Sequence, residues 1–328
     1  MPNGFVVDEK FPDVIEYLVN EDWVACPHHT YPNCLLRYTN YVKIQWQYVK
    51  PHQTINHLQH SILLSRKHEL LHHLETRPSI HSFLPRSTTD IDFWFKMFVY
   101  TQALLVLKNR EIHAQRLPIA RLIGDEMRRL NDPTNAKLHG LQFMNQDFLG
   151  RHSQAINDLL NPDHSQEKIE NSDPHVDDEL LLYLEACDPQ FHFNSTRNLW
   201  IAKPSGLSQG RGIELISSQA QFDAFRKAHD KAIVVQQYIE RPFLIFDRKF
   251  DIRQWVLITD TEPLTIYWYD KCYLRFASKP YSLAHDDSLD DKFMHLCNNS
   301  IQKASDIPNH PEIPGHMWNL ERFQLHLS

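Results

Sequence analysis

Three of the chain's eight glycines, Gly206, Gly210 and Gly212, fall within seven residues, directly after the strand-like sequence NLWIAKP. Glycine lets backbone N–H groups approach an anion without interference from a Cβ atom. Lys203, at the end of the strand-like sequence, would bring a positive charge to the same place. This pattern is typical of a loop that holds the phosphates of a nucleotide. A flexible surface loop is the alternative, and the glycine cluster alone does not decide between the two.

Two segments further along the chain have the chemistry of a nucleotide site. The sequence VVQQYIERP, at 234–242, has the pattern of a buried strand that runs into a polar hinge. In FDIRQW, at 250–255, the alternation of a strand puts Asp251 and Arg253 on one face. The glycine cluster itself matches neither the G-x-x-x-x-G-K-[ST] phosphate loop nor the G-x-G-x-x-G dinucleotide fingerprint. The three segments together indicate a nucleotide site of another type.

A zinc hydrolase is the rival hypothesis. The sequence HELLH, at 68–72, matches H-E-x-x-H, which on a helix offers two imidazoles to zinc and a glutamate as base. The chain has 21 histidines, so chance matches are frequent, and the two histidines can simply face solvent. A second ligand-rich stretch, Cys26, His28, His29 and Cys34, has a spacing that fits no standard zinc finger. Zinc chemistry therefore stays a remote alternative.

The elements that would position these residues follow two patterns. Apolar residues recur at helical spacing in 54–74, 92–107 and 112–130, while the aromatic run 41–49 suggests strands. After residue 180 the pattern changes to short β-type runs with one helical stretch at 218–229. The expected strands are 199–202, 212–216, 232–236, 250–259, 264–269 and 272–276. Since 199–202 and 232–236 both change from apolar to polar residues at their ends, we expect these two to be neighbouring strands. The sequence thus predicts an α+β chain whose helices come first.

An acidic stretch separates the two patterns. Residues 158–179 carry eight Asp or Glu residues against a single lysine, and Pro162 and Pro174 interrupt any helix there. We expect a linker or an insertion at this place.

The segments KPSGLSQGRGI, VVQQYIERP, KFDIRQWVLITD, YLRF and HLCNNSIQK occur in the order found in tubulin-tyrosine-ligase-like enzymes. The chain resembles this family closely over residues 195–328, and more loosely at 44–57 and 83–87. The spelling of HLCNNSIQK, at 295–303, and of MWNLERFQ, at 317–324, is similar to the glycylase branch.

The resemblance implies an ATP-grasp fold preceded by a helix-rich domain. The expected parts are the N-terminal helix-rich domain at 1–157, the linker at 158–179, a central ATP-grasp subdomain at 180–236 and a C-terminal ATP-grasp subdomain at 237–328.

By the same resemblance, the chain is an ATP-dependent ligase that joins glycine to glutamate side chains of tubulin. ATP would phosphorylate the carboxylate, and the amine of glycine would then attack the acyl phosphate. Tubulin or microtubules would be the partner, without nucleic acid or membrane, and the chain would be a monomer of the cytoplasm, the cytoskeleton and the cilium or flagellum. The alternatives within this family are a glutamylase and a noncatalytic module that binds tubulin and ATP.

The resemblance also assigns roles to single residues. Lys203 would bind ATP phosphate, and Arg211 with Gly212 would form the loop that closes over the triphosphate. The adenine hinge would consist of Gln236, Gln237, Tyr238 and Ile239. The residues expected beside the nucleotide are Lys249, Asp251, Cys297 and Asn298. The catalytic residues would be Asp251, Arg253 and Arg275, with the two guanidinium groups neutralising phosphoryl charge, and Ser300 and Lys303 would lie near the amino-acid substrate.

Two features depart from the family's pattern. The hinge usually reads Gln-Lys, whereas Gln237 occupies the lysine position, so an amide replaces one cationic contact to the nucleotide. The family also continues into a strand with an Asp and an E-x-N pair that hold magnesium, and no E-x-N follows Arg253. We therefore expect the Mg²⁺ ligands to lie beyond Ser328, no metal ligand within these residues, and an incomplete C-terminal subdomain.

Composition sets further limits. A length of 328 residues with 42% hydrophobic residues is enough for two ordinary cores. No run approaches the ~18 apolar residues of a membrane span, and the first residues lack the pattern of a signal peptide. Five scattered cysteines predict free thiols in a reducing compartment. The net charge of -7 means that binding to an acidic tubulin tail would need a local basic surface.

Overall fold

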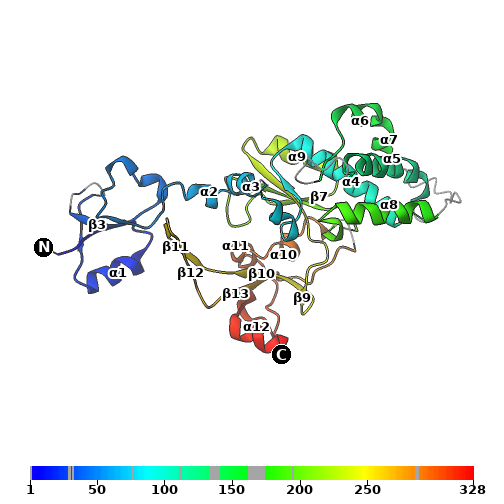
Figure 1. Cartoon of the computed structure of the whole chain (residues 1–328). Helices are drawn as coiled ribbons and strands as arrows, with labels where there is room; N and C mark the ends of the chain where they lie inside the picture. Colours follow the sequence, from blue (N-terminus) through cyan, green and yellow to red (C-terminus); the bar gives the residue numbers. More distant parts are fainter. Residues whose placement is uncertain are drawn as a thin grey trace. The chain divides into compact units, whose positions relative to one another are not determined.

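The structure is a computed structural model, which describes residues 2–28, 31, 33–75, 77–110, 113–132, 141–161, 174–193, 196–284 and 288–328. It forms two compact units (Figure 1). The first comprises Met1–Arg66 and Val256–Tyr269, and the second comprises Lys67–Trp255 and Asp270–Ser328.

The first unit contains a parallel sheet of strand order β2-β1-β3-β4 and an antiparallel hairpin of β11 and β12. Its elements are β1 (Gly4–Val7), α1 (Pro12–Asn20), β2 (Val24–Ala25), β3 (Cys34–Tyr38), the 3-10 helices η1 (Tyr41–Lys43) and η2 (Trp46–Tyr48), β4 (Thr54–Ile55), α2 (Ile62–Ser65), β11 (Val256–Thr261) and β12 (Leu264–Trp268).

The second unit combines a helical part with two antiparallel four-stranded sheets, so the predicted mixture of helix and sheet is confirmed. The helical part consists of α3 (Lys67–Glu75), η3 (Pro78–Ser82), α4 (Ile91–Lys108), η4 (Ala114–Arg116), α5 (Leu117–Leu130), α6 (Gln146–Arg151), α7 (Ser153–Leu160), α8 (Pro174–Cys187) and η7 (Phe191–Phe193). The first sheet and its helix consist of β5 (Ser87–Thr88), β6 (Trp200–Pro204), β7 (Glu214–Ile216), α9 (Gln219–Ala228) and β8 (Ile233–Gln237). The remaining elements are β9 (Leu244–Ile245), β10 (Arg248–Arg253), β13 (Tyr273–Phe276), α10 (Lys292–His295), α11 (Asn299–Gln302), η9 (Pro314–His316), β14 (Met317–Asn319) and α12 (Leu320–Leu327).

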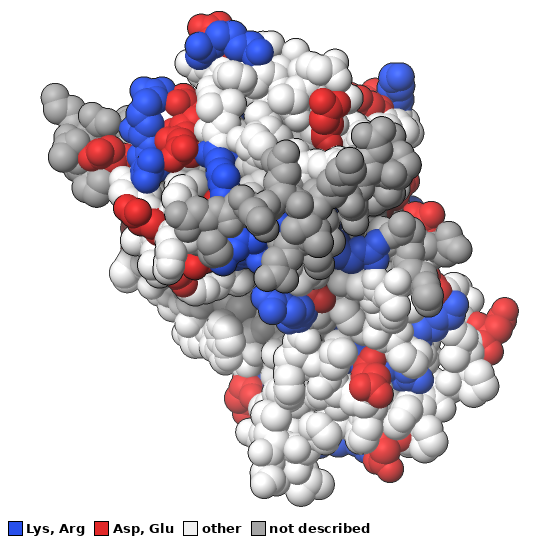
Figure 2. Space-filling view, turned by 90° about the vertical axis from the view of Figure 1, so that its right-hand side faces the viewer, with Lys and Arg blue, Asp and Glu red and all other residues white. Residues whose placement is uncertain are grey.

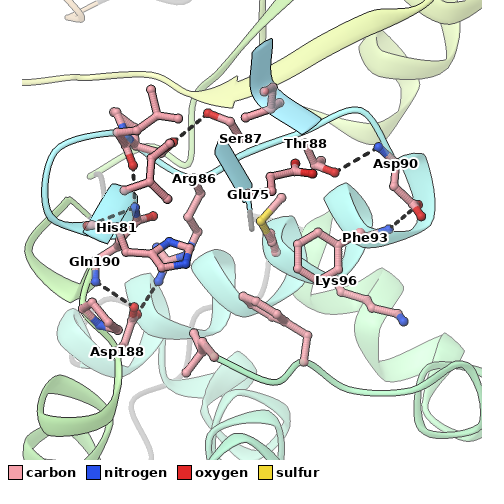
Figure 3. A pocket seen from close by; sticks show the side chains of 18 of the residues that line it. Glu75, His81, Arg86, Ser87, Thr88, Asp90, Phe93, Lys96, Asp188 and Gln190 are labelled. Atoms are coloured by element: carbon pink, nitrogen blue, oxygen red, sulfur yellow. Dashed lines mark hydrogen bonds and ion pairs between the residues drawn. The ribbon is translucent and has the colours of Figure 1, made fainter. Parts of the chain in front are cut away.

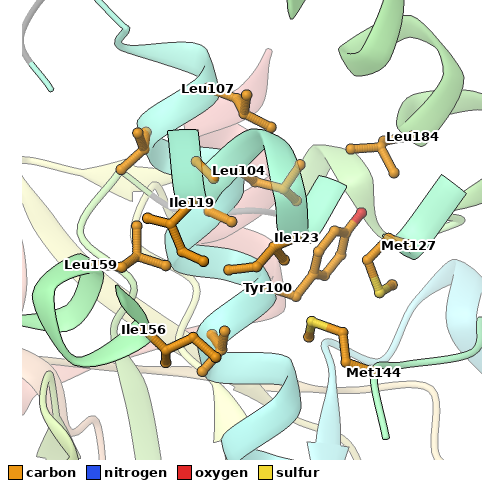
Figure 4. Close-up of a cluster of buried hydrophobic side chains, with 14 of the residues drawn as sticks. Tyr100, Leu104, Leu107, Ile119, Ile123, Met127, Met144, Ile156, Leu159 and Leu184 are labelled. Carbon is orange, nitrogen blue, oxygen red and sulfur yellow. The ribbon is translucent and has the colours of Figure 1, made fainter. Parts of the chain in front are cut away.

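The largest core lies among the helices of the second unit (Figure 4). Helix α4 begins where Asp90 accepts a hydrogen bond from the N–H of Phe93 at 2.9 Å. It supplies Tyr100 and Leu104 to a buried cluster with Ile123 of α5, and α7 and α8 close the same cluster. Burial around most of its circumference explains why α4 is apolar on almost every side.

The first sheet, of order β5-β8-β6-β7, is covered on one face by α4 and α9. The ring of Trp94 on α4 stacks on Phe222 of α9 with 3.9 Å between centroids, and Trp200 of β6 meets Trp94 edge-on. Because α4 contributes to both cores, the helices predicted as an N-terminal domain share a core with strands β6 and β8. The other face of the sheet carries Leu199 and Ile201 and packs against the segments around Leu296.

The second sheet has the order β14-β13-β10-β9. Its core contains Leu274, Phe276 and Trp318, with Phe323 of α12 packed against it. In Figure 1, α12 lies beside β13.

Several predicted elements differ in the structure. The run 41–49 was predicted as strand but forms two 3-10 helices, the first of which begins where Asn40 accepts a hydrogen bond from the N–H of Val42. The predicted helix 54–74 is interrupted, because β4 occupies its start and helices α2 and α3 follow separately. The predicted strand 250–259 is broken at 254–255, between β10 and β11.

Other expectations have mixed outcomes. The five cysteines are free thiols, as predicted. Residues 162–173 of the predicted acidic linker lie outside the described residues, while its ends belong to α7 and α8. No helix in the described part of the chain is long and apolar enough to cross a membrane. The subdomain boundaries stay a prediction.

Candidate nucleotide-binding site

Lys203 reaches its position through the alternation of β6. Trp200 and Ala202 face the core under α4 and α9, so Ile201 and Lys203 belong to the opposite face. The Nζ atom of Lys203 donates to Oε1 of Gln236 on the neighbouring strand β8 at 2.7 Å. The predicted pairing of these two strands is confirmed, and it brings two of the expected site residues together.

Lys249 supplies a second ammonium group from β10 of the other sheet. Its Nζ donates to the hydroxyl of Tyr238 at 2.9 Å and to the carbonyl oxygen of His295 at 3.0 Å. The same ammonium lies 4.3 Å from the centroid of the Tyr238 ring. Lys249 is therefore held at the junction of the two sheets.

Lys67 is a third ammonium group, which the sequence patterns did not reveal. It begins α3, and its Nζ donates to the carbonyl oxygens of Pro204, at 3.1 Å, and of Leu207. Lys67 thus binds the backbone at the start of the glycine-rich loop. No local motif marks it, because the residues that it contacts lie 137 and 140 positions further along the chain.

The three ammonium groups form a cationic cluster, named here by Lys67, Lys203 and Lys249. Burial lowers the pKa of Lys203 to about 8, and the positive charges of Lys249 and Lys67 add to this effect. Burial also lowers the pKa of Lys249 and of Lys67. Within the described ranges none of the three makes an ion pair with a carboxylate; each donates to neutral oxygens instead. A bound anion would offset both the free-energy cost of burying these charges and the repulsion between them, so the cluster suits a polyphosphate.

The glycine-rich loop rests on the start of α11. A Cβ atom on Gly210 would lie 2.5 Å from Cδ1 of Ile301 and 2.7 Å from Oδ1 of Asn298, and the φ of Gly210 is +78°. The hydroxyl of Ser300 donates to the carbonyl oxygen of Gln209 at 2.9 Å. Asn298 and Ser300, expected near ATP and the amino acid, therefore lie against the loop predicted to hold phosphates.

Three further expected site residues, Arg211, Gly212 and Lys303, are held less firmly by neighbouring groups. The side chain of Arg211 is exposed and donates only weakly to the carbonyl oxygen of Ser208, at 3.4 Å. Gly212 has a φ of +66°, a conformation that favours glycine. Lys303 is exposed at the end of α11.

Asp251 and Arg275 neutralise each other. They face one another across β10 and β13, and two hydrogen bonds of 2.7 Å join the guanidinium to the carboxylate. This contact is the main cause that raises the pKa of Arg275. Arg253 is exposed and lies 4.6 Å from the centroid of the Trp255 ring. Neither arginine is bonded to a residue of the cationic cluster in these contacts.

The hinge residues point in different directions. Gln236 faces Lys203, whereas the amide of Gln237 lies on the opposite face of β8, where its Oε1 accepts from Nη1 of Arg86 at 3.3 Å. The ring of Tyr238 is buried. Ile239 is 49% exposed, and its side chain can cover the face of a base. The side chain of Gln237 is thus placed to support the hinge from the face of β8 opposite to Lys203.

Cys297 lies in the wall of the site. It is buried, and its Sγ donates to the carbonyl oxygen of Lys249 at 3.5 Å. Burial raises the pKa of the thiol to about 12, so it stays protonated at neutral pH. Cys297 therefore supports Lys249 rather than acting as a nucleophile.

The described residues offer no evident metal centre. In HELLH, Nδ1 of His68 lies 2.6 Å from the hydroxyl of Ser205, and its Nε2 lies 3.2 Å from Glu69. Nowhere in the described ranges do three His, Cys, Asp or Glu residues gather as a metal site. Asp251, the acidic residue expected beside the nucleotide, is bonded to Arg275. These residues fit neither the zinc hypothesis nor a protein-held Mg²⁺.

A cavity of about 560 Å³ lies between α3, α4 and the segments around residues 84–88, 141–143 and 188–190 (Figure 3). Its lining includes Ser87, whose hydroxyl accepts from Nε2 of Gln236 at 2.8 Å. Lys203 and Lys249 are not among its lining residues. The cavity is therefore a neighbour of the cationic cluster and not part of it.

Basic and acidic side chains are interspersed on the face of the molecule drawn in Figure 2. Among the described residues of this face, basic side chains do not form the broad surface that an acidic partner would favour.

Comparisons with known proteins point to one family. The model of the tubulin-tyrosine ligase family matches residues 147–328. Human tubulin monoglycylase TTLL3 is 38% identical over 189 residues, which cover 55% of this chain and 23% of that protein. Tubulin glycylase 3D of Tetrahymena thermophila is 41% identical over 165 residues, or 49% of this chain and 16% of the relative. Mouse protein monoglycylase TTLL8 is 45% identical over 158 residues, which cover 45% of this chain and 18% of that protein. The similarity thus spans about a fifth of each relative's own length.

Proposed function

Because the chain belongs to the tubulin-tyrosine ligase family, we propose that it is an ATP-dependent ligase that joins glycine to glutamate side chains of tubulin. The cationic cluster of Lys67, Lys203 and Lys249 is the observation that carries the ATP part of this proposal. The glycine part is supported by relatives named as glycylases. An association with the cytoskeleton follows from the same relatives.

We assign the phosphates of ATP to the cationic cluster and to the glycine-rich loop. Lys203 and Lys249 come from the two sheets, so a polyphosphate between them would be bound from both sides. Lys67 holds the backbone at the start of the loop. The exposed side chain of Ile239 and the backbone beside it would receive the base. This arrangement supports the proposal of an ATP-grasp site.

The reaction needs an activated carboxylate. An oxygen of the glutamate side chain would attack the γ-phosphorus, and the bond to ADP would break. The neutral amine of glycine would then attack the carbonyl carbon of the acyl phosphate, expelling inorganic phosphate, releasing one proton to solvent and leaving an isopeptide bond. The cationic cluster would orient the triphosphate and balance its charge. Arg275 would add its guanidinium group if it donates to a phosphate oxygen as well as to Asp251. We assign no step to a protein-held magnesium ion.

Incorporation of radiolabelled glycine into microtubules tests this function. The chain is incubated with microtubules, ATP and labelled glycine, and a parallel reaction contains labelled glutamate. In a chain that also carries the Asp and the E-x-N pair of the family's pattern, we expect ATP-dependent incorporation of glycine, and its loss in Lys203→Ala. Incorporation of glutamate alone would replace the proposal by a glutamylase. Binding of ATP without incorporation of either amino acid would replace it by a noncatalytic module.

A further inference from the structure

We propose that Arg86 is a positioning residue for the nucleotide base, which fixes residues 237–239 of the hinge from the face of β8 opposite to Lys203. This inference rests on the proposed function, because it concerns the same ATP site. Arg86 lies at 83–87, where the family resemblance is loose, and none of the roles considered above includes it.

Arg86 holds Gln237 in two ways. Strand β5 pairs with β8 so that Ser87 faces Gln236. In the same register the N–H of Gln237 donates to the carbonyl oxygen of Arg86 at 2.7 Å. The guanidinium of Arg86 contacts the same residue, because its Nη1 donates to Oε1 of the Gln237 amide at 3.3 Å. One residue thus fixes both the backbone and the side chain of Gln237, the second hinge residue.

The guanidinium is itself held in place. Its other nitrogen, Nη2, forms an ion pair with Asp188, and the two side chains are only 5% and 1% exposed. Asp188 also accepts from the hydroxyl of Tyr100 at 3.2 Å and from the N–H of Gln190 at 3.0 Å. Figure 3 shows Arg86 extending along the wall of the cavity to Asp188, with Gln190 beside it. A buried ion pair with further hydrogen bonds defines one geometry even where it adds little net stability.

The backbone hydrogen bonds that fix the hinge extend up to its exposed residue, Ile239. The N–H of Tyr238 donates to the carbonyl oxygen of Leu199 at 2.9 Å, so the two hinge peptides before Ile239 are both tied to neighbouring segments. Ile239 follows them and is half exposed. Arg86 therefore acts on the base through Gln237, while the phosphates are held from the other face of the strand. The two effects are separable by experiment.

Calorimetry with two ligands separates them. ATP contains the base and the phosphates, whereas inorganic tripolyphosphate contains the phosphates alone. In Arg86→Lys, which keeps a positive charge beside Asp188 but loses the planar fork, we expect about tenfold weaker ATP binding, the effect of roughly one hydrogen bond. Binding of tripolyphosphate should stay within about twofold of the wild-type value. Gln237→Met, which leaves the Arg86–Asp188 pair intact, should show the same split.

Arg121→Lys is the matched control, because it alters the same kind of ion pair, here between Arg121 and the buried Asp177, without touching the hinge. It should bind both ligands like the wild type. The positioning role would be overturned if Arg86→Lys and Gln237→Met lost affinity equally for both ligands, or lost affinity for neither. A wild-type chain that binds tripolyphosphate as tightly as ATP would overturn it too, because no base contact would then exist. Absence of binding to both ligands would instead refute the proposed ATP site, and this inference with it.

Discussion

Nζ of Lys203 and Oε1 of Gln236 are joined by a 2.7 Å hydrogen bond between adjacent strands. The amide of Gln236 is held in this orientation because its Nε2 donates to the hydroxyl of Ser87 on β5 at 2.8 Å. Three neighbouring strands thus fix the ammonium group before any ligand arrives, which lowers the cost of ordering it on binding.

Gln236→Leu should weaken ATP binding by about tenfold. Without its acceptor, the buried ammonium of Lys203 loses a hydrogen bond and releases its proton more readily, so a smaller fraction is charged at neutral pH. Ser87→Ala keeps the acceptor and should change the affinity by less than about threefold. Calorimetry of the two variants checks this, and equal effects would mean that the amide does not position Lys203.

ATP binding should weaken as the pH rises from 7 to 9. Lys203 is charged below its pKa of about 8 and neutral above it, so at pH 9 about one chain in ten carries the charge and the apparent affinity falls roughly tenfold. Lys203→Met should remove the part of this dependence that is due to Lys203, leaving the part due to Lys249 and Lys67, whose pKa values burial also lowers. Affinity that is constant or rising over this range would contradict the assignment.

Gly210→Ala should disturb the glycine-rich loop, whereas Gly206→Ala should not. A Cβ on Gly210 meets Ile301 and Asn298 at less than 3 Å and requires a left-handed φ, while the nearest atom to a Cβ on Gly206 lies 3.8 Å away. We expect Gly210→Ala to lower the free energy of unfolding by about 1–2 kcal/mol and to speed proteolysis within the loop. Thermal unfolding and limited proteolysis compare the pair. Indistinguishable variants would show that the loop does not rest on α11.

Asp251→Asn should strengthen the binding of tripolyphosphate in metal-free buffer. The carboxylate now neutralises Arg275, and its removal leaves an extra positive charge near Lys249, worth roughly threefold to tenfold in affinity. Asp270→Asn, which removes the same charge outside this contact, serves as control. Weaker binding in Asp251→Asn would indicate that the carboxylate itself contacts the ligand.

The sequence predicted those parts of the site that local patterns encode. The change from apolar to polar residues that 199–202 and 232–236 share was sufficient to predict the pairing of β6 with β8. Both strands bury one face under α4 and α9. Gly210 of the predicted loop occupies a place that no side chain fits, while the role of the loop in binding phosphates stays a prediction. The family resemblance placed Lys203 and Lys249 in one site, and the structure brings their charges within reach of each other.

The parts that the sequence missed depend on contacts between distant segments. Lys67 reaches Pro204 through the folded chain, and nothing in its neighbours signals this. The direction of Gln237 depends on the partner of β8, and its amide meets Arg86 only because β5 is the next strand. Residues 250–259 have the alternation of one long strand, but pairing moves from β13 to β12 at residues 254–255, so the strand is divided there.

Calorimetric titration of the wild-type chain and of Lys203→Ala with ATP tests the central claim most directly. We predict that the wild type binds one ATP per chain and that Lys203→Ala binds at least about tenfold more weakly, because a charge-assisted hydrogen bond to phosphate is lost. Lys227→Ala, which removes an exposed charge from α9, is the control and should bind like the wild type. Equal ATP affinity in Lys203→Ala and the wild type, with both folded, would contradict the placement of the phosphates at the cationic cluster.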